Sequence, residues 1–324
     1  MQFKLNLPVL ASLVLMPVFA LMVSPSIADK ANFSVQKTFS ADGNPHFIGV
    51  NSATQRLYAS DVMAGTVTLF DALTGLKLAE TATGAGAHTV VVDALNNLVY
   101  VTNRGANTLS ILNGETLAKI TDIAVGTAPH GLDLDYPRHQ IYVSNTGSHN
   151  VTVIDMDTRK VIKTIASGEG PWGVTHHPEK PWIYTSNTNE GTISRIDLST
   201  GQTLAKTTVG GRPWSIRYSA ETKRVYATNE TLGLVTVLKN DVIVAEVPVG
   251  QAPHGFTFVA DDFIAVAATG SNQVTIIDLE KNKVVQQITV DAGPTSLTAD
   301  AQGRHLYVAC QTGGKVNVLV QPDN

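Results

Sequence analysis

The sequence APHGLDLDYPRHQIYVSN, residues 128–145, contains two short motifs that decide the fold because both recur along the chain. The first motif ends on His130, directly after a proline. Its third position recurs at residues 46, 88, 130, 172, 214, 254 and 295, with spacings of 42, 42, 42, 42, 40 and 41. A fixed period of about forty residues indicates a repeat architecture.

The second motif, Tyr-x-Ser/Thr-Asn at residues 142–145, keeps step with the first. Its other copies are Tyr58–Asp61, Tyr100–Asn103, Tyr184–Asn187, Tyr226–Asn229 and Tyr307–Cys310, with a degenerate Ala265–Ala268 in the sixth repeat. Within the repeat that follows His130, the alternating or β-branched segments are 131–134, 140–144, 151–155 and 161–165. Such segments, separated by Gly, Pro and Asn, are typical of strands and turns. Four short strands per repeat predict an all-β, seven-bladed β-propeller.

The two ends of the chain supply the closure that a propeller requires. The last repeat stops after its third strand, Lys315–Val320, and the segment Phe33–Ser40 precedes the first repeat where a fourth strand belongs. An open sheet edge is a liability in β proteins. We therefore expect Phe33–Ser40 to pair with the last blade. The chain has one cysteine, Cys310, so no internal disulfide can form and the closure must depend on burial and hydrogen bonds.

The tetrapeptide Tyr100-Val101-Thr102-Asn103 and its in-phase relatives resemble the YVTN family of β-propeller repeats. Residues 33–320 are similar to the YncE-like periplasmic propellers. The resemblance implies the propeller fold and a periplasmic protein, but no particular activity, because propellers host unrelated functions. Asp61, Ala268 and Cys310 replace the asparagine of the motif, so the asparagines do not form a uniform ring.

The N-terminus has the features of a secretory signal peptide. Lys4 precedes an apolar stretch at 5–23, and the small-x-small triplet Ser26-Ile27-Ala28 follows it. The alternative is a membrane anchor, which the two prolines within the apolar stretch and the cleavage triplet disfavour. We expect residues 1–28 to be removed, leaving residues 29–324 as one propeller domain, exported to the periplasm or secreted. We expect this domain to be monomeric, with no membrane insertion after cleavage.

The net charge of −4 gives no general attraction for nucleic acid or anionic membranes, so only a local basic patch could provide one. Strand direction places the Pro-His positions, the ends of the Tyr-x-Ser/Thr-Asn strands and the longer polar loops on one face. This face is the predicted binding face. Its central ring of candidate ligand-binding residues, one from each blade, reads His46, His88, His130, Trp172, Trp214, His254 and Thr295, with Arg104 and Arg212 beside it.

Three interpretations of this ring compete. Neighbouring imidazoles of His46, His88 and His130 could bind a transition metal. Trp172 and Trp214 could stack on a base, ring or sugar, and with the arginines could bind a short single-stranded nucleic acid. The third interpretation is structural, with the rings filling the channel. No metal is required by the pattern, so the expected cofactor is none, with a transition metal at the mouth as the alternative.

No catalytic signature appears in the sequence: there is no G-x-S-x-G, Walker, H-E-x-x-H or dinucleotide fingerprint. Asp61, Asn103 and Asn145 could mimic the oxygen-rich metal site of a propeller lactonase, but carboxylates on this face are few. The asparagines are better explained as turn-stabilising residues. The sequence therefore favours a non-catalytic propeller that binds an unidentified small ligand or a periplasmic protein. A metal-dependent hydrolase and a nucleic-acid binder are the alternatives.

Overall fold

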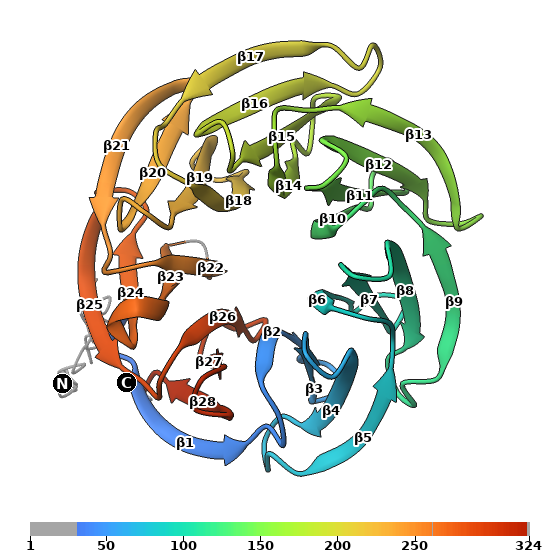
Figure 1. Cartoon of the computed structure of the whole chain (residues 1–324). Coiled ribbons are helices and arrows are strands. Elements are labelled where there is room, and N and C mark those ends of the chain that lie inside the picture. The colour runs from blue at the N-terminus through green and yellow to red at the C-terminus, as the bar shows by residue number, and fades with distance from the viewer. Residues whose placement is uncertain (1–30, 261, 323–324) are drawn as a thin grey trace, which may run out of the picture.

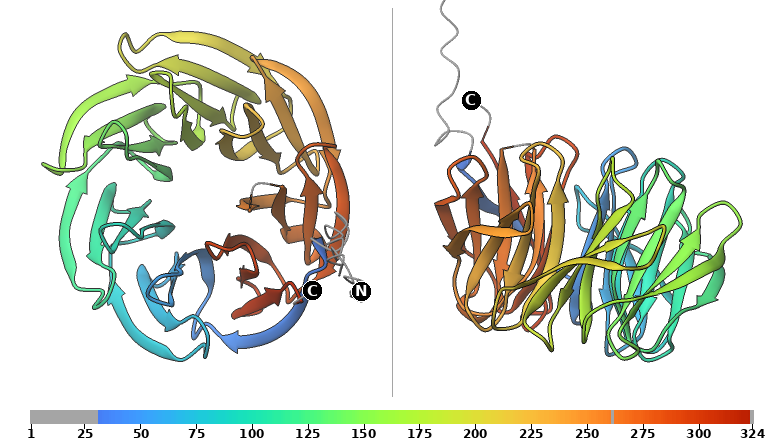
Figure 2. Two further views of the ribbon diagram at one scale, coloured as in Figure 1. Left: turned by 180° about the vertical axis from the view of Figure 1, so that it is seen from behind. Right: turned by 90° about the horizontal axis from the view of Figure 1, so that it is seen from above.

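The computed structural model describes residues 31–260 and 262–322, and the predicted signal peptide at 1–28 lies outside the described residues. The described chain forms seven four-stranded antiparallel sheets arranged as blades around a central channel (Figure 1). The same ring is seen from behind in Figure 2, and the view from above shows the strands running between two faces. The prediction of an all-β, seven-bladed propeller with four-stranded blades is confirmed.

Each blade has the same strand order from channel to rim. The innermost strands are β2 (Pro45–Asn51), β6 (Ala87–Asp93), β10 (Pro129–Asp135), β14 (Pro171–His176), β18 (Pro213–Ser219), β22 (Pro253–Val259) and β26 (Pro294–Ala299). The second strands are β3 (Arg56–Asp61), β7 (Leu98–Asn103), β11 (Gln140–Asn145), β15 (Trp182–Asn187), β19 (Arg224–Asn229), β23 (Phe263–Ala268) and β27 (His305–Cys310).

The two outer positions complete the blades. The third strands are β4 (Thr66–Asp71), β8 (Thr108–Asn113), β12 (Asn150–Asp155), β16 (Thr192–Asp197), β20 (Leu234–Lys239), β24 (Gln273–Asp278) and β28 (Lys315–Val320). The rim strands are β5 (Lys77–Ala82), β9 (Lys119–Ala124), β13 (Lys160–Ala166), β17 (Thr203–Thr208), β21 (Val242–Pro248), β25 (Lys283–Thr289) and, from the N-terminal end, β1 (Ser34–Ser40). A short 3-10 turn, η2 (Thr269–Ser271), follows β23.

The first and last parts of the chain share one sheet, as the sequence predicted. β1 pairs antiparallel with β28 in the sheet β1-β28-β27-β26, from Ser34 opposite Val320 to Ser40 opposite Lys315. Phe33, one residue before β1, is 1% exposed and packs in the apolar core. Its backbone exchanges two hydrogen bonds with the Gln286 side chain, of 2.9 and 2.7 Å. Closure is therefore anchored both in the sheet and in the neighbouring blade.

The core lies between the blades, because each sheet packs an apolar face against the next. The cluster between the first two blades contains Tyr58, Leu69, Val90 and Val99, all at most 5% exposed. The tyrosine of the repeat motif is buried, and the Tyr58 hydroxyl donates a 2.6 Å hydrogen bond to the Gly114 carbonyl of the next blade. Tyr58 thus joins adjacent blades through both apolar packing and a satisfied polar group.

Small residues let the inner strands approach one another around the channel. A Cβ at Gly131 would lie 2.5 Å from the Trp172 carbonyl oxygen, and one at Gly173 would lie 2.9 Å from the Trp214 carbonyl oxygen. These positions directly follow His130 and Trp172 in the chain. Glycine is therefore required here for the close approach of two backbones.

Candidate functional site

A β-bulge at the start of each inner strand directs the ring residues toward the channel. In the third blade, Pro129 pairs with Asn145 and Leu132 pairs with Val143, so His130 and Gly131 both lie opposite Ser144. The other six inner strands shift register at the equivalent point. A bulge changes the direction in which a side chain points. Since the paired prolines and asparagines mark one face, the predicted ring does lie at that face.

A hydroxyl from the second strand of the preceding blade bonds to the backbone carbonyl of five of the seven ring residues. Ser144 Oγ accepts a 2.9 Å hydrogen bond from the Gly131 N–H and donates a 2.5 Å bond to the Trp172 carbonyl of the next blade. Equivalent bonds to the next blade run from Ser60 to His88, Thr102 to His130, Ser186 to Trp214, and Thr228 to His254. We call these side chains the hydroxyl links. The sequence analysis missed their role, although every third position of the motif in the first five blades is Ser or Thr.

Six rings from six consecutive inner strands touch in a continuous layer, which we call the His/Trp layer. The centroid distances are 4.5 Å for His46–His88, 4.5 Å for His88–His130, 3.7 Å for His130–Trp172, 3.8 Å for Trp172–Trp214 and 4.5 Å for Trp214–His254. Thr295 occupies the seventh position, where its hydroxyl donates a 2.6 Å hydrogen bond to the His46 carbonyl. The layer therefore runs from the first blade to the sixth, and Thr295 of the seventh blade joins it to His46.

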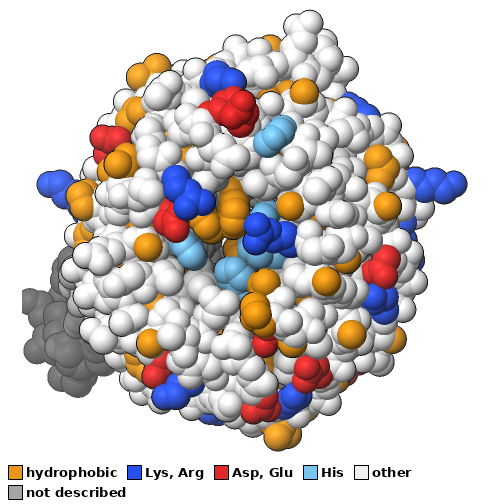
Figure 3. All heavy atoms as spheres, viewed as in Figure 1, with side chains coloured by type: hydrophobic (Ala, Val, Ile, Leu, Met, Phe, Trp, Pro, Cys, Tyr) orange, Lys and Arg blue, Asp and Glu red, His pale blue; other side chains and the backbone are white. Residues whose placement is uncertain are grey.

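The layer is unevenly exposed. His88, His130 and Trp214 are 2%, 0% and 8% exposed, whereas His46, Trp172 and His254 are half-buried. Figure 3 shows this face hollowed at its centre, with histidine side chains in the hollow and basic side chains beside it. Trp214 has its flat face covered by His254, whose ring lies at an angle of 5° to it. Of the two tryptophans in the layer, Trp172 offers a ligand the more accessible surface.

Burial keeps the four imidazoles of the layer uncharged at neutral pH. Burial, helped by the charges of His254 and Arg104, lowers the pKa of His46 to about 4. Burial also lowers the pKa of His130 to about 3 and that of His254 to about 4, and lowers the pKa of His88 well below its usual range. Removing a cation from water is costly, so these rings remain neutral and each has one nitrogen that can accept a hydrogen bond.

Three nitrogens of these rings are buried without a hydrogen-bond partner among the described residues: His46 Nδ1, His130 Nε2 and His254 Nδ1. For His130 the tautomer follows from its neighbours. Its Nδ1 lies 3.0 Å from the Ala128 carbonyl oxygen, which can only accept, so Nδ1 carries the hydrogen. His130 Nε2 is therefore a buried acceptor with no donor. Since buried polar atoms are nearly always paired, this atom calls for a ligand or an ordered water.

Two arginines flank the layer, as the sequence predicted, and they differ in their ion pairs with the described residues. Arg212 forms an ion pair of 3.1 Å with Glu230 and lies 5.4 Å from the centroid of the Trp214 ring. Glu230 also lies 3.7 Å from His254 Nε2. The exposed Arg104 side chain makes no ion pair with any residue in the described ranges, and its charge contributes to the lowered pKa of His130. Arg104 is thus the cation available to a ligand.

Within residues 31–260 and 262–322, no three His, Cys, Asp or Glu side chains form a group that could hold a metal ion. His46, His88 and His130, the candidate metal ligands from the sequence, are described residues and form no such group. The rings of His46 and His88 meet edge to face, at 69°. Asp61, the candidate carboxylate of a lactonase-like site, accepts hydrogen bonds from the backbone N–H groups of Asn44, Met63 and Ala64.

The asparagines of the motif are buried inside the blades. Asn145 Nδ2 donates two 2.8 Å hydrogen bonds to the side chains of Asn150 and Thr152, on the next strand of the same blade. Asn103 and Asn187 make equivalent bonds, and Asn229 Nδ2 donates to the Gly210 carbonyl. In the last blade Cys310 occupies this position and is fully buried, and burial raises its pKa to about 12. These groups hold the strands together rather than facing the hollow.

A second cavity, of about 520 Å³, lies at the opposite face between the fourth and fifth blades. Its lining includes Trp182, where the Arg195 guanidinium lies 4.2 Å from the ring centroid. Arg195 in turn forms a two-point ion pair with Asp241. Trp182 begins β15, at the end opposite Asn187, so the third tryptophan of the chain is remote from the His/Trp layer.

Residues 76–181 match the model of a family described as YNCE-like β-propeller. The resemblance to the YncE-like propellers is confirmed. No curated protein sequence matches this chain significantly. No helix in the described part of the chain is long and apolar enough to cross a membrane.

Solved structures resemble this propeller in fold. Hydrazine synthase of Kuenenia stuttgartiensis is 19% identical with a TM-score of 0.74, the match covering 85% of this chain and 95% of that one. A catalytically inactive virginiamycin B lyase from Staphylococcus aureus, solved with quinupristin, is 16% identical with a TM-score of 0.76, covering 89% of this chain and 99% of that one. At these identities the likeness concerns the fold, and function must be argued from the site.

Proposed function

We propose that the protein is an exported, non-catalytic propeller that binds a small planar anion at the His/Trp layer. The observation that carries the proposal is His130 Nε2, a fully buried acceptor without a donor among the described residues. A ligand N–H or O–H group would satisfy it. A buried acceptor left without a partner costs about 1–3 kcal/mol, and a ligand donor would recover this free energy.

The surroundings of His130 define the rest of the ligand. Trp172, in contact with the His130 ring at a centroid distance of 3.7 Å, is half-buried and offers an aromatic surface for stacking. Arg104 has no ion-pair partner in the described chain and offers a charge to a carboxylate or phosphate. A flat ring with hydrogen-bond donors and one negative group matches all three features. Nucleobases attached to phosphate have this chemistry, and stacking contributes roughly 1–3 kcal/mol per base.

The export step rests on residues 1–28. We expect protein recovered from the periplasm to begin at Asp29, because the small residues Ser26 and Ala28 fit the signal-peptidase pattern. N-terminal sequencing and intact mass would check this. A periplasmic product that retains residues 1–28, or a product confined to the cytoplasm, would contradict it.

Binding can be followed by tryptophan fluorescence with the four ribonucleoside 5′-monophosphates as probes. We expect at least one of them to quench the fluorescence, because Trp172 contributes to the proposed stacking surface. Trp172→Ala should weaken binding about tenfold or more, in line with the loss of one stacking contact. Arg104→Gln should weaken the binding of the nucleotides. It should leave the binding of the matched nucleosides unchanged, because they lack phosphate.

The matched control is Trp182→Phe, since Trp182 lies at the opposite face beside the second cavity. This variant should bind the nucleotides as the parent does. If Trp182→Phe abolishes quenching, or if none of the monophosphates binds, the proposal fails. Tighter binding of a short oligothymidylate, with an affinity that falls steeply with salt, would replace it by single-stranded nucleic acid. Stoichiometric metal in the purified protein, lost in His130→Phe, would replace it by a metal site.

A further inference from the structure

A chamber lies in the channel directly beneath the His/Trp layer and has no role in the proposed function. It encloses about 230 Å³ and is lined by the inner strands of all seven blades. Trp172 contributes to its lining from the layer, and Phe47 lies just below the layer, with its ring centroid 5.1 Å from that of His88. Trp172 thus belongs both to the layer on the face shown in Figure 3 and to the lining of this chamber.

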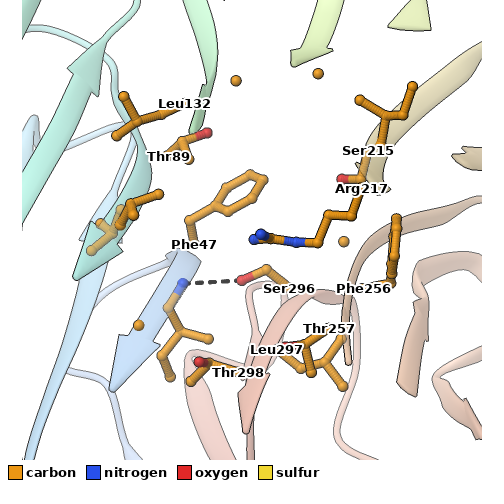
Figure 4. A pocket seen from close by; sticks show the side chains of 18 of the residues that line it. Phe47, Thr89, Leu132, Ser215, Arg217, Phe256, Thr257, Ser296, Leu297 and Thr298 are labelled. Carbon is orange, nitrogen blue, oxygen red and sulfur yellow. Dashed lines mark hydrogen bonds between the residues drawn. The ribbon is translucent and has the colours of Figure 1, made fainter. Parts of the chain in front are cut away.

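One charged side chain, Arg217 on β18, lines this chamber among the described residues. Figure 4 shows the Arg217 guanidinium reaching into the chamber, with the Phe47 ring directed into it from β2. Arg217 is exposed, and it makes no side-chain hydrogen bond or ion pair with any residue of the described chain. An unpaired guanidinium that faces an enclosed space with low-dielectric walls attracts anions more strongly than one on an open surface.

The carboxylate that occupies a similar position in another blade is already engaged by a neighbouring histidine. Asp133, on the inner strand of the third blade, lies 2.7 Å from His176 Nδ1 and accepts a second bond of 2.7 Å from the His176 backbone N–H. Asp133 does not line the chamber. The chamber therefore keeps the positive charge of Arg217.

The remaining lining decides what kind of anion fits. Apolar side chains such as Phe47, Val91 and Phe256 line the walls, and the hydroxyls of Ser215 and Thr298 stand beside them without side-chain hydrogen bonds to other described residues. A guanidinium recognises a carboxylate through two parallel N–H···O bonds. From this combination we infer that the chamber binds a small organic monocarboxylate with an apolar body, its carboxylate on Arg217 and its body against Phe47.

This site is separate from the His/Trp layer. Arg217 is three residues beyond Trp214 on the same strand, which corresponds to about 10 Å along the channel. Arg217 lies toward the end of β18 away from the layer and is exposed, so the ligand would enter from the opposite face. The inference stands whether or not the layer binds a nucleotide.

Isothermal titration calorimetry with benzoate tests the inference, and benzamide, its uncharged counterpart, tests the requirement for the carboxylate. We expect the parent protein to bind benzoate at least tenfold more tightly than benzamide. R217Q should reduce benzoate affinity about tenfold or more, to the level of benzamide, since charge-assisted bonds are the strong ones. Arg217 has no side-chain partner among residues 31–260 and 262–322, so R217Q should also melt at the temperature of the parent.

R104Q provides the crossed control, because Arg104 lies on the other side of the layer. It should leave benzoate binding unchanged, while R217Q should leave nucleotide binding unchanged. The proposed function and this inference are therefore tested independently. Equal affinity of the parent for benzoate and benzamide, or equal benzoate affinity of R217Q and the parent, would overturn the inference. Displacement of benzoate by inorganic phosphate at a concentration below the Kd of benzoate would also overturn the inference. The chamber would then be an inorganic-anion site.

Discussion

Removal of residues 33–40 is expected to abolish the closed ring. The deletion takes away β1 and leaves the edge of β28 without its partner strand. It also removes Phe33, which is 1% exposed, and burial of a phenylalanine alone contributes about 3–5 kcal/mol. Since whole domains are stable by about 5–15 kcal/mol, we expect the truncated chain to be unfolded or to associate through the open edge.

Circular dichroism melting and size-exclusion chromatography of the chain from Asp29 onward would measure this effect. Val35→Thr is the matched control, because Val35 lies on β1 with its side chain 38% exposed. It should melt within a few degrees of the parent, whereas Phe33→Ala should fall between the control and the deletion. A deleted chain that remains monomeric and melts as the parent does would show that the ring is not held by β1.

Acid is expected to destabilise the protein through the His/Trp layer. Burial lowers the pKa of His46 and His254 to about 4, that of His130 to about 3, and that of His88 well below its usual range. In the unfolded chain these imidazoles titrate near pH 6.5. Above about pH 6.5 these histidines are neutral in both states, so the free energy of unfolding has its full value. As the pH falls from about 6.5 toward the pKa values of the folded state, the unfolded chain takes up protons that the folded protein does not, and the free energy of unfolding decreases.

The expected slope is large because the four rings act together. Each histidine that takes up a proton on unfolding contributes roughly 1.4 kcal/mol per pH unit, so the layer contributes about 5 kcal/mol per unit at its steepest. The charges that face the layer are Arg104, Arg212, Asp61 and Glu230. The lowered pKa values of Asp71, Asp155 and Asp197 act below their ordinary value of 3.8, and so only at the acid end of this window.

His176 acts in the opposite direction and reduces the net slope. Its burial tends to lower its pKa, but the hydrogen bond and the charge of Asp133 outweigh burial and raise it. A histidine with a raised pKa stabilises the fold below about pH 6.5 and loses that contribution as the pH rises through its folded value. It therefore offsets part of the acid effect without reversing it.

Urea unfolding measured from pH 7.5 to pH 4.5 would give the slope directly. His254→Phe should reduce it by about the contribution of one histidine, because a phenyl ring can stack on Trp214 but does not titrate. The exposed His139 offers the control, and His139→Gln should leave the slope unchanged. A free energy of unfolding that is constant between pH 7 and pH 5 would contradict the protonation argument.

The fold was predictable because the sequence repeats its own pattern seven times. Spacing located the inner strands, and the alternation around Tyr142 located the second and third strands to within a residue or two. Even the degenerate segment Ala265–Ala268 lies within a regular strand, β23. The pairing of residues 33–40 with the last blade followed from the missing fourth strand. These inferences needed only local pattern and the requirement that a β-sheet edge be covered.

The residues of the candidate site could be predicted from the sequence, but the contacts between their side chains could not. The sequence brought His46, His88, His130, Trp172, Trp214 and His254 to one ring, and the structure places them there. It could not show that Trp214 is covered by His254, or that His130 Nε2 lacks a donor, because both depend on the bulge and on loops of other blades. Arg217 was missed because its significance lies in the absence of a partner across the channel, which no local pattern encodes.

The meeting of the two ends in one blade also determines how the molecule can be handled. Ser34 and Val320 are directly opposite each other in the outermost pair of strands (Figure 1). A tag, linker or immobilising surface attached at either terminus would therefore hold the molecule by the same place on its circumference. Both faces of the ring would then stay accessible to a solution flowing past, so the two proposed sites could be titrated on a sensor chip without one attachment hiding either of them.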